Sequence, residues 1–259
     1  MKIVFLGTSD FVAPVLDCLR KNFEVVASFS STDQEIEIEK LRKLDPDLFV
    51  VASFGKILKK EVLDIPKYGA VNIHPSLLPE YRGSTPIQVT ILNGDVNSGI
   101  TIIKMDEEMD HGPILFQKET EITDNDTFET LSKRLFKLGA DHLPQVLNDY
   151  VTGDLKPAPQ DHERATFTSL LKKEDGFIDA GNPPPPDKIK RMIRAYFPWP
   201  GVWTKCHPEQ SEGSNLEGKI LKLLPEDKIQ VEGKNPMSYK DFMNGYSKGK
   251  EILEKLKLI

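Results

Sequence analysis

Short apolar runs, each closed by a glycine or a turn, limit most strongly how this chain can fold. Residues 3–6 are continuously apolar and end at Gly7, and residues 48–52 follow the turn formed by residues 45–47. Runs of this length are typical of strands that are buried on both faces of a sheet. Segments with helical spacing of apolar residues separate them. The alternation predicts an α/β domain with a mostly parallel sheet.

The same patterns place the other elements of this domain. Predicted strands cover residues 3–6, 24–29, 48–52, 69–73 and 99–105. Predicted helices cover the segment after Ser9 and Asp10 and residues 34–44, 86–92 and 127–150. The last helix contains Pro144, which we expect to bend or divide it, because proline cannot donate a helical hydrogen bond.

Four consecutive prolines at positions 183–186 predict a stiff connector and a domain boundary. We therefore divide the chain into residues 1–180 and 181–259. A helix that begins near Asp187 carries Ile189, Met192, Ile193 and Tyr196 on one face. Short strand candidates at 202–205, 219–224 and 228–231 follow it and predict a small β domain.

Charge and cysteine content narrow the class of protein. The chain has 34 Lys and Arg against 40 Asp and Glu, a net charge of −6, which argues against a surface coated with positive charge but allows a local basic patch. The two cysteines, Cys18 and Cys206, are too few for a four-cysteine zinc site or a disulfide framework, which suggests a reducing compartment. No segment approaches the ~18 apolar residues of a membrane span. We expect a cytoplasmic protein without a membrane partner.

Several common motifs are missing. Gly7 stands alone, so the G-x-G-x-x-G signal for a dinucleotide is not present after the first strand. The sequence has no phosphate-binding G-x-x-x-x-G-K-[ST] loop, and its five histidines show no helical metal-binding pattern. We therefore expect no metal.

One segment concentrates polar chemistry at a predicted strand end. Asn72 and His74 are two positions apart, so an extended backbone points both to one face. Ligands of open α/β sheets bind at this edge. A second loop, at residues 105–115, places four acids, Asp106, Glu107, Glu108 and Asp110, after another strand. An amide, an imidazole and a carboxylate can together stabilise an oxyanion and transfer protons, so they can catalyse acyl transfer without a covalent enzyme intermediate.

Each of these residues also has a structural interpretation. Asn72 can cap a strand end, and His74 can be an ordinary loop histidine beside Pro75. The acidic loop can be a solvated surface, and so can the basic face of the helix at 187–196. Residue spacing alone leaves these alternatives open.

Three ordered motifs resemble the folate-dependent formyltransferases. They are Gly7-Thr8-Ser9-Asp10-Phe11, the segment from Asn72 through Ser76-Leu77-Leu78-Pro79 to Gly83, and the pattern M-D-x-x-x-D-x-G-x-I at residues 105–114. The resemblance implies a Rossmann-like formyltransferase domain followed by a small β-barrel of the OB type. About three strand candidates are too few for a complete barrel of this kind.

The resemblance also implies the site. It assigns catalytic roles to Asn72, His74 and Asp110, with 10-formyltetrahydrofolate as the co-substrate. Ser76, Leu77, Leu78 and Pro79 would border the folate, and the apolar end of the strand at 48–54 would help to wall its ring.

Later segments favour the branch of this family that acts on initiator methionyl-tRNA. We also expect the protein to be a monomer. Residues 165–168, 172–179 and 193–201 carry this likeness. Two parts depart from it: the long basic loop after the second strand is replaced by an acidic segment at 35–39, and the C-terminal part is short. A formyltransferase for a small amine, such as an amino sugar nucleotide, and a formyltetrahydrofolate hydrolase therefore stay open. The best candidates for a basic surface are the helix at 188–194 and Lys56, Lys59 and Lys60.

Overall fold

The computed structural model describes residues 1–32, 37–206 and 216–259. They form two compact units. The first consists of Met1–Ile87, Val96–Thr123 and Glu129–Ser169, and the second of Gln88–Asp95, Asp124–Phe128 and Leu170–Ile259. The predicted acidic segment and the predicted helix at 34–44 begin outside the described residues, which resume at position 37.

The first unit is built on a six-stranded sheet in the order β2-β1-β3-β4-β6-β7. The first four strands in this order are parallel, and β6 and β7 are antiparallel to their neighbours. This confirms the predicted α/β class with a mostly parallel sheet. The strands are β1 (Lys2–Gly7), β2 (Glu24–Phe29), β3 (Leu48–Ala52), β4 (Ala70–His74), β6 (Asn97–Lys104) and β7 (Ile114–Glu121).

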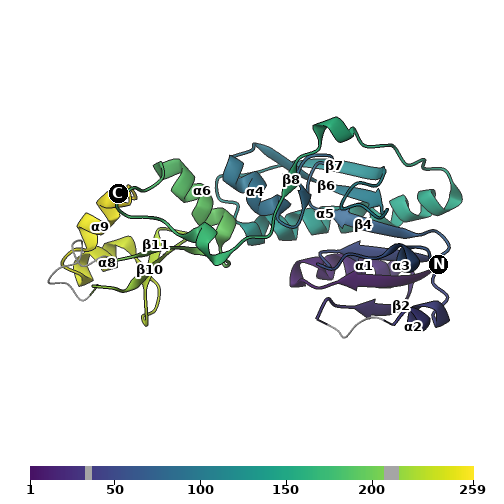
Figure 1. Ribbon diagram of the computed structural model, residues 1–259, viewed down its shortest axis with the longest axis horizontal. Coiled ribbons are helices and arrows are strands. Elements are labelled where there is room, and N and C mark those ends of the chain that lie inside the picture. The colour runs from purple at the N-terminus through teal and green to yellow at the C-terminus, as the bar shows by residue number, and fades with distance from the viewer. Residues whose placement is uncertain (33–36, 207–215) are drawn as a thin grey trace. The chain divides into compact units, whose positions relative to one another are not determined.

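Helices cover both faces of this sheet (Figure 1). On one face, a Cβ added to Gly139 of α5 would meet Ile73 and Ile100, so α5 packs directly on β4 and β6. The Cys18 thiol of α1 donates to the Ala140 carbonyl of α5 over 3.1 Å. The helices of this unit are α1 (Ala13–Asn22), α2 (Ile38–Lys43), α3 (Lys60–Leu63) and α5 (Phe128–Thr152), whereas most of α4 (Pro86–Asn93) belongs to the second unit.

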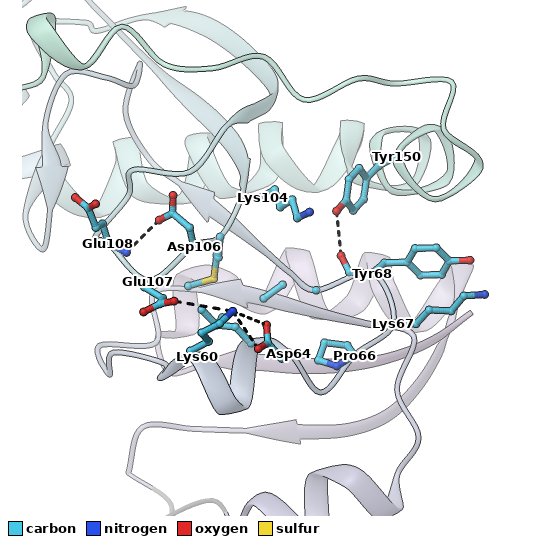
Figure 2. Close-up of a pocket in the computed structure, with 14 residues that line it drawn as sticks. Lys60, Asp64, Pro66, Lys67, Tyr68, Lys104, Asp106, Glu107, Glu108 and Tyr150 are labelled. Carbon is cyan, nitrogen blue, oxygen red and sulfur yellow. Dashed lines mark hydrogen bonds and ion pairs between the residues drawn. The ribbon is translucent and has the colours of Figure 1, made fainter.

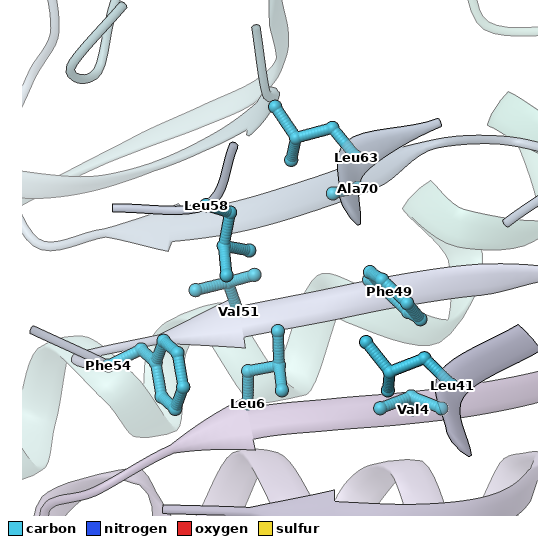
Figure 3. Close-up of a cluster of buried hydrophobic side chains, with 9 residues drawn as sticks. All are labelled: Val4, Leu6, Leu41, Phe49, Val51, Phe54, Leu58, Leu63 and Ala70. Carbon is cyan, nitrogen blue, oxygen red and sulfur yellow. The ribbon is translucent and has the colours of Figure 1, made fainter. Parts of the chain in front are cut away.

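The other face of the sheet carries a dense apolar cluster (Figure 3). Phe49 of β3 lies in it, fully buried, beside residues of the neighbouring strand β1. Leu41 of α2 and Leu63 of α3 cover the cluster. Burial on both faces explains why β1 and β3 are continuous apolar runs instead of alternating patterns.

Of the two effects predicted for Pro144, a bend or a division, division of the long helix is wrong. α5 runs from Phe128 to Thr152 with Pro144 inside it. Its buried face, which includes Leu135, Leu143 and Leu147, continues on both sides of the proline. Most helical stability comes from packing such a face, so the packing outweighs the one hydrogen bond that proline cannot make.

The second unit contains a four-stranded antiparallel sheet in the order β12-β11-β10-β9. Its strands are β9 (Val202–Lys205), β10 (Ile220–Leu224), β11 (Lys228–Val231) and β12 (Met237–Ser238). Three match the predicted strands. Its helices are α6 (Pro186–Tyr196), α8 (Tyr239–Gly245) and α9 (Gly249–Lys255).

The apolar face of α6 is the predicted one, because Ile189, Met192, Ile193 and Tyr196 are all buried. Burial also raises the pKa of the Tyr196 phenol. Among the helices that the structure describes, none combines the length and the apolar character needed to cross a bilayer.

Candidate active site

The three polar residues predicted from sequence lie together. Asn72 and His74 are on β4, and Asp110 is in the loop between β6 and β7. Asp110 Oδ1 accepts a hydrogen bond from Asn72 Nδ2 over 3.1 Å and lies 3.5 Å from His74 Nδ1. His74 is only 4% exposed. One carboxylate oxygen therefore joins the amide and the imidazole in a shielded place, where electrostatic interactions are stronger than in water.

The other ring nitrogen of His74 is already used. His74 Nε2 lies 2.9 Å from the backbone carbonyl of Tyr81. A carbonyl can only accept, so this nitrogen carries the hydrogen. Nδ1 therefore faces Asp110, and a proton between these two groups would link them. A hydrogen bond from His74 to a substrate oxygen would have to come from Nδ1.

A two-stranded element fixes the second oxygen of Asp110. The Gly83 N–H donates to Asp110 Oδ2 over 2.8 Å. Gly83 belongs to β5 (Arg82–Gly83), which pairs in parallel with β8 (Phe167–Thr168). Its φ is +107°, and a Cβ there would collide with the Thr168 carbonyl. This position therefore requires glycine.

Two buried polar residues that the sequence reasoning did not assign complete this region. Gln160 contacts the backbone at Asp110 and Gly112, and Arg82 contacts Gln160. Arg82 stands inside the recognised motif, so its position was a usable signal. Gln160 lies in a polar segment without any pattern, and its contacts are with residues about 50 to 80 positions away in the chain.

The predicted folate-bordering loop is largely part of the protein framework. Ser76 and Leu78 are buried, whereas Leu77 and Pro79 keep some exposed surface. The Ser76 hydroxyl donates to the Glu80 carbonyl, and the Leu78 N–H donates to the Thr101 hydroxyl. These bonds fix the loop against β6.

An open cavity of about 840 Å³ lies near the start of β4 and the end of β6 (Figure 2). Its wall includes Asp106–Glu108 from the loop that carries Asp110, but none of the three polar residues lines it. Lys60 in this wall donates to the Asp64 carboxylate, and this hydrogen bond raises the pKa of the Lys60 ammonium. Both positively and negatively charged side chains line this cavity, whereas a pocket for an aromatic ring is mainly apolar.

The described residues were also compared with the ligand groups that bind metal ions. Within residues 1–32, 37–206 and 216–259, no three His, Cys, Asp or Glu side chains gather as a metal site would need.

This chain is similar in sequence and fold to known proteins. Residues 7–147 match the family model described as formyl transferase. This segment contains Asn72, His74 and Asp110 together with five strands of the six-stranded sheet and the last residue of β1. The chain belongs to the formyl transferase family.

Its relatives narrow this membership to the methionyl-tRNA formyltransferases. The chain is 50% identical over 228 residues to the methionyl-tRNA formyltransferase of Roseiflexus castenholzii, covering 79% of this chain and 72% of the relative. It is 36% identical over 287 residues to that of Fusobacterium nucleatum, covering 98% and 88%. The solved methionyl-tRNA formyltransferase from Clostridium thermocellum superposes with a TM-score of 0.70 over 92% of this chain and 98% of that one. Its 20% identity makes this a likeness of fold.

Proposed function

We propose that this protein transfers the formyl group of 10-formyltetrahydrofolate to the α-amino group of initiator methionyl-tRNA. Formyl transfer to methionyl-tRNA is the reaction for which the relatives are named. The observation that carries the chemistry is the Asp110 carboxylate, which contacts Asn72, His74 and the Gly83 N–H at once. A general base placed between two hydrogen-bond donors suits attack of an amine on a carbonyl carbon.

In the proposed reaction the co-substrate supplies the formyl group, and the side chains manage charge and protons. The Asn72 amide has a second N–H, which can donate to the formyl oxygen as negative charge develops there. Such a donor is worth about 3 kcal/mol of the barrier. Asp110 accepts a proton from the attacking amine, directly or through water, and orients His74. His74 Nδ1, which lies 3.5 Å from Asp110 Oδ1, can relay this proton to the folate nitrogen, which leaves with the rest of the tetrahydrofolate when its bond to the formyl carbon breaks.

For the folate we propose the side of the site bordered by residues 76–79. Leu77 and Pro79 offer the accessible surface, and the buried pair Ser76 and Leu78 shape the loop.

We further infer that one chain suffices for the reaction, since a single chain supplies Asn72, His74 and Asp110. The protein is accordingly proposed to be a monomer. Initiator tRNA is charged and used in the cytoplasm, which is where we place the reaction. We interpret the four-stranded sheet of the second unit as a reduced OB-like barrel, a proposal supported by its antiparallel strands.

Binding of tRNA phosphates requires positive side chains on the protein, and α6 is the best candidate to supply them. Arg191 Nε and Arg194 Nη1 donate to the carbonyls of Leu92 and Asp126, so these two side chains support the structure. Lys188 and Lys190 are exposed. We propose that both contact phosphates of the tRNA.

Replacing both lysines, Lys188→Ala with Lys190→Ala, is expected to raise the KM for methionyl-tRNA without changing the KM for the folate. The slope of log KM for methionyl-tRNA against log salt concentration should decrease by ~2, which is one unit for each phosphate contact that is removed. The measurement is initial rate at a series of salt concentrations. Lys118→Ala, an exposed lysine on β7, is the matched control. An unchanged slope would refute the assignment of α6 to the tRNA.

The function itself is tested by incubating the purified chain with 10-formyltetrahydrofolate and one acceptor at a time. We expect formylated product with methionyl initiator tRNA and much less with the elongator tRNA. A preference for an amino sugar nucleotide would replace the proposed acceptor. Formate release at an equal rate without any acceptor would identify a hydrolase instead.

A further inference from the structure

A buried amide lies directly behind the carboxylate that the proposed reaction depends on. Gln160 is 6% exposed. Its Nε2 donates to the Asp110 carbonyl over 2.9 Å and to the Gly112 carbonyl over 2.7 Å. Its Oε1 accepts from Arg82 Nη2 over 2.7 Å and from Arg82 Nε over 3.3 Å. All four hydrogen-bonding positions of the amide are therefore occupied.

These partners allow only one orientation of the amide. Rotating it by half a turn would place Oε1 against two carbonyl oxygens and the NH₂ group against a guanidinium. Arg82 is itself 4% exposed, and its Nη2 also lies 2.8 Å from His162 Nδ1. Arg82 makes no ion pair with a carboxylate in the part of the chain that the structure describes, so Gln160 is a principal acceptor for a buried positive charge.

The backbone that Gln160 holds is in an unfavourable conformation. Asp110 has φ = +51°, in the left-handed region that residues other than glycine seldom adopt. A residue keeps such a conformation only when its surroundings fix it. Here Gln160 holds the Asp110 carbonyl, and the Gly83 N–H holds the side-chain oxygen Oδ2.

The structure assigns Gln160 as a positioning residue that sets the Asp110 carboxylate against Asn72 and His74, with Arg82 as its anchor. This inference rests on the proposed function. Gln160 makes no contact with Asn72 or His74 and acts through the backbone of the loop. Displacing a catalytic group by about 1 Å can cost on the order of 100-fold in rate, so a distant amide can matter to the reaction.

Gln160→Glu separates this role from simple packing. The substitution keeps the shape of the side chain and its bonds from Arg82, but it replaces the NH₂ donor by an acceptor that faces two carbonyls. We expect kcat for formylation to fall on the order of 100-fold, while both KM values change less than about threefold. Gln145→Glu, on the exposed side of α5, is the matched control and should retain the wild-type kcat.

A second pair of variants tests whether Gln160 acts through Asp110. In an Asp110→Asn background, Gln160→Glu should reduce kcat by less than about threefold further, because residues that act as one unit are not additive. The same 100-fold loss in both backgrounds would refute the inference, and so would a Gln160→Glu enzyme with normal kcat. Thermal melting of each variant identifies any that has unfolded, and Gln160→Met, also without a donor, then serves as the substitute. Failure of the wild-type chain to formylate methionyl-tRNA would instead refute the proposed function.

Discussion

Asp110→Asn is expected to reduce kcat for formylation by on the order of 1000-fold, the largest catalytic effect we predict. The substitution removes the proposed general base and its negative charge. It also places an NH₂ group toward donors, because Oδ1 accepts from Asn72 Nδ2 and Oδ2 accepts from the Gly83 N–H. A loss of 1000-fold corresponds to about 4 kcal/mol of barrier.

The measurement is single-turnover formylation with both substrates saturating, so that binding does not limit the rate. Glu108→Gln is the control, since it removes an exposed charge from the same loop. It should keep kcat within about threefold of wild type, as surface charges of this kind contribute little. An Asp110→Asn enzyme that retained a tenth of the normal kcat and a normal melting temperature would contradict the role of this carboxylate.

Local pattern was enough to predict the central strands and to place two residues of the candidate site on one face of a strand. The runs at residues 3–6 and 48–52 can be buried only inside a two-sided sheet, and they became β1 and β3. Asn72 and His74 follow from the period of an extended strand. The edge strand β7 gave no such signal because half of its residues are exposed and polar, from Gln117 to Glu119 in particular.

The rest of the site depends on contacts that no local pattern contains. Asp110 could be singled out among four neighbouring acids only through the family motif, since all of them are equivalent by spacing. Gln160 and the pairing of β5 with β8 join residues 48 to 86 positions apart. Their hydrogen bonds exist only after the sheet has formed, so propensity and periodicity could not reveal them.

Contacts with residues distant in the chain also determine which side chains of the loop at residues 76–79 are buried. The family resemblance implied that this loop borders the folate, and in the structure two of its side chains, Ser76 and Leu78, are buried. Thr101 of β6 bonds both the Leu78 N–H and the Ser76 carbonyl, and Gln117 of β7 bonds the Leu78 carbonyl. These hydrogen bonds hold the loop against β6 and β7.

Phe49→Ala is expected to produce the largest loss of stability, about 3 to 5 kcal/mol in the free energy of unfolding. Phe49 is fully buried, and in the sheet it lies between Val4 of β1 and Ala70 of β4. Removing the ring loses its burial and leaves a cavity in a cluster that Leu41 covers (Figure 3).

The loss should appear in urea titration as a lower midpoint with an unchanged slope, because the surface exposed on unfolding is nearly the same. Val96→Ala, which shortens an exposed apolar side chain of the same unit, should change the free energy by less than about 0.5 kcal/mol. Since β3 pairs directly with β4, the strand that carries Asn72 and His74, the Phe49→Ala enzyme should lose activity at the same urea concentrations at which it unfolds. If activity disappeared well below that midpoint, the residues around Asn72 and His74 would be unfolding separately from the sheet, which would contradict this expectation.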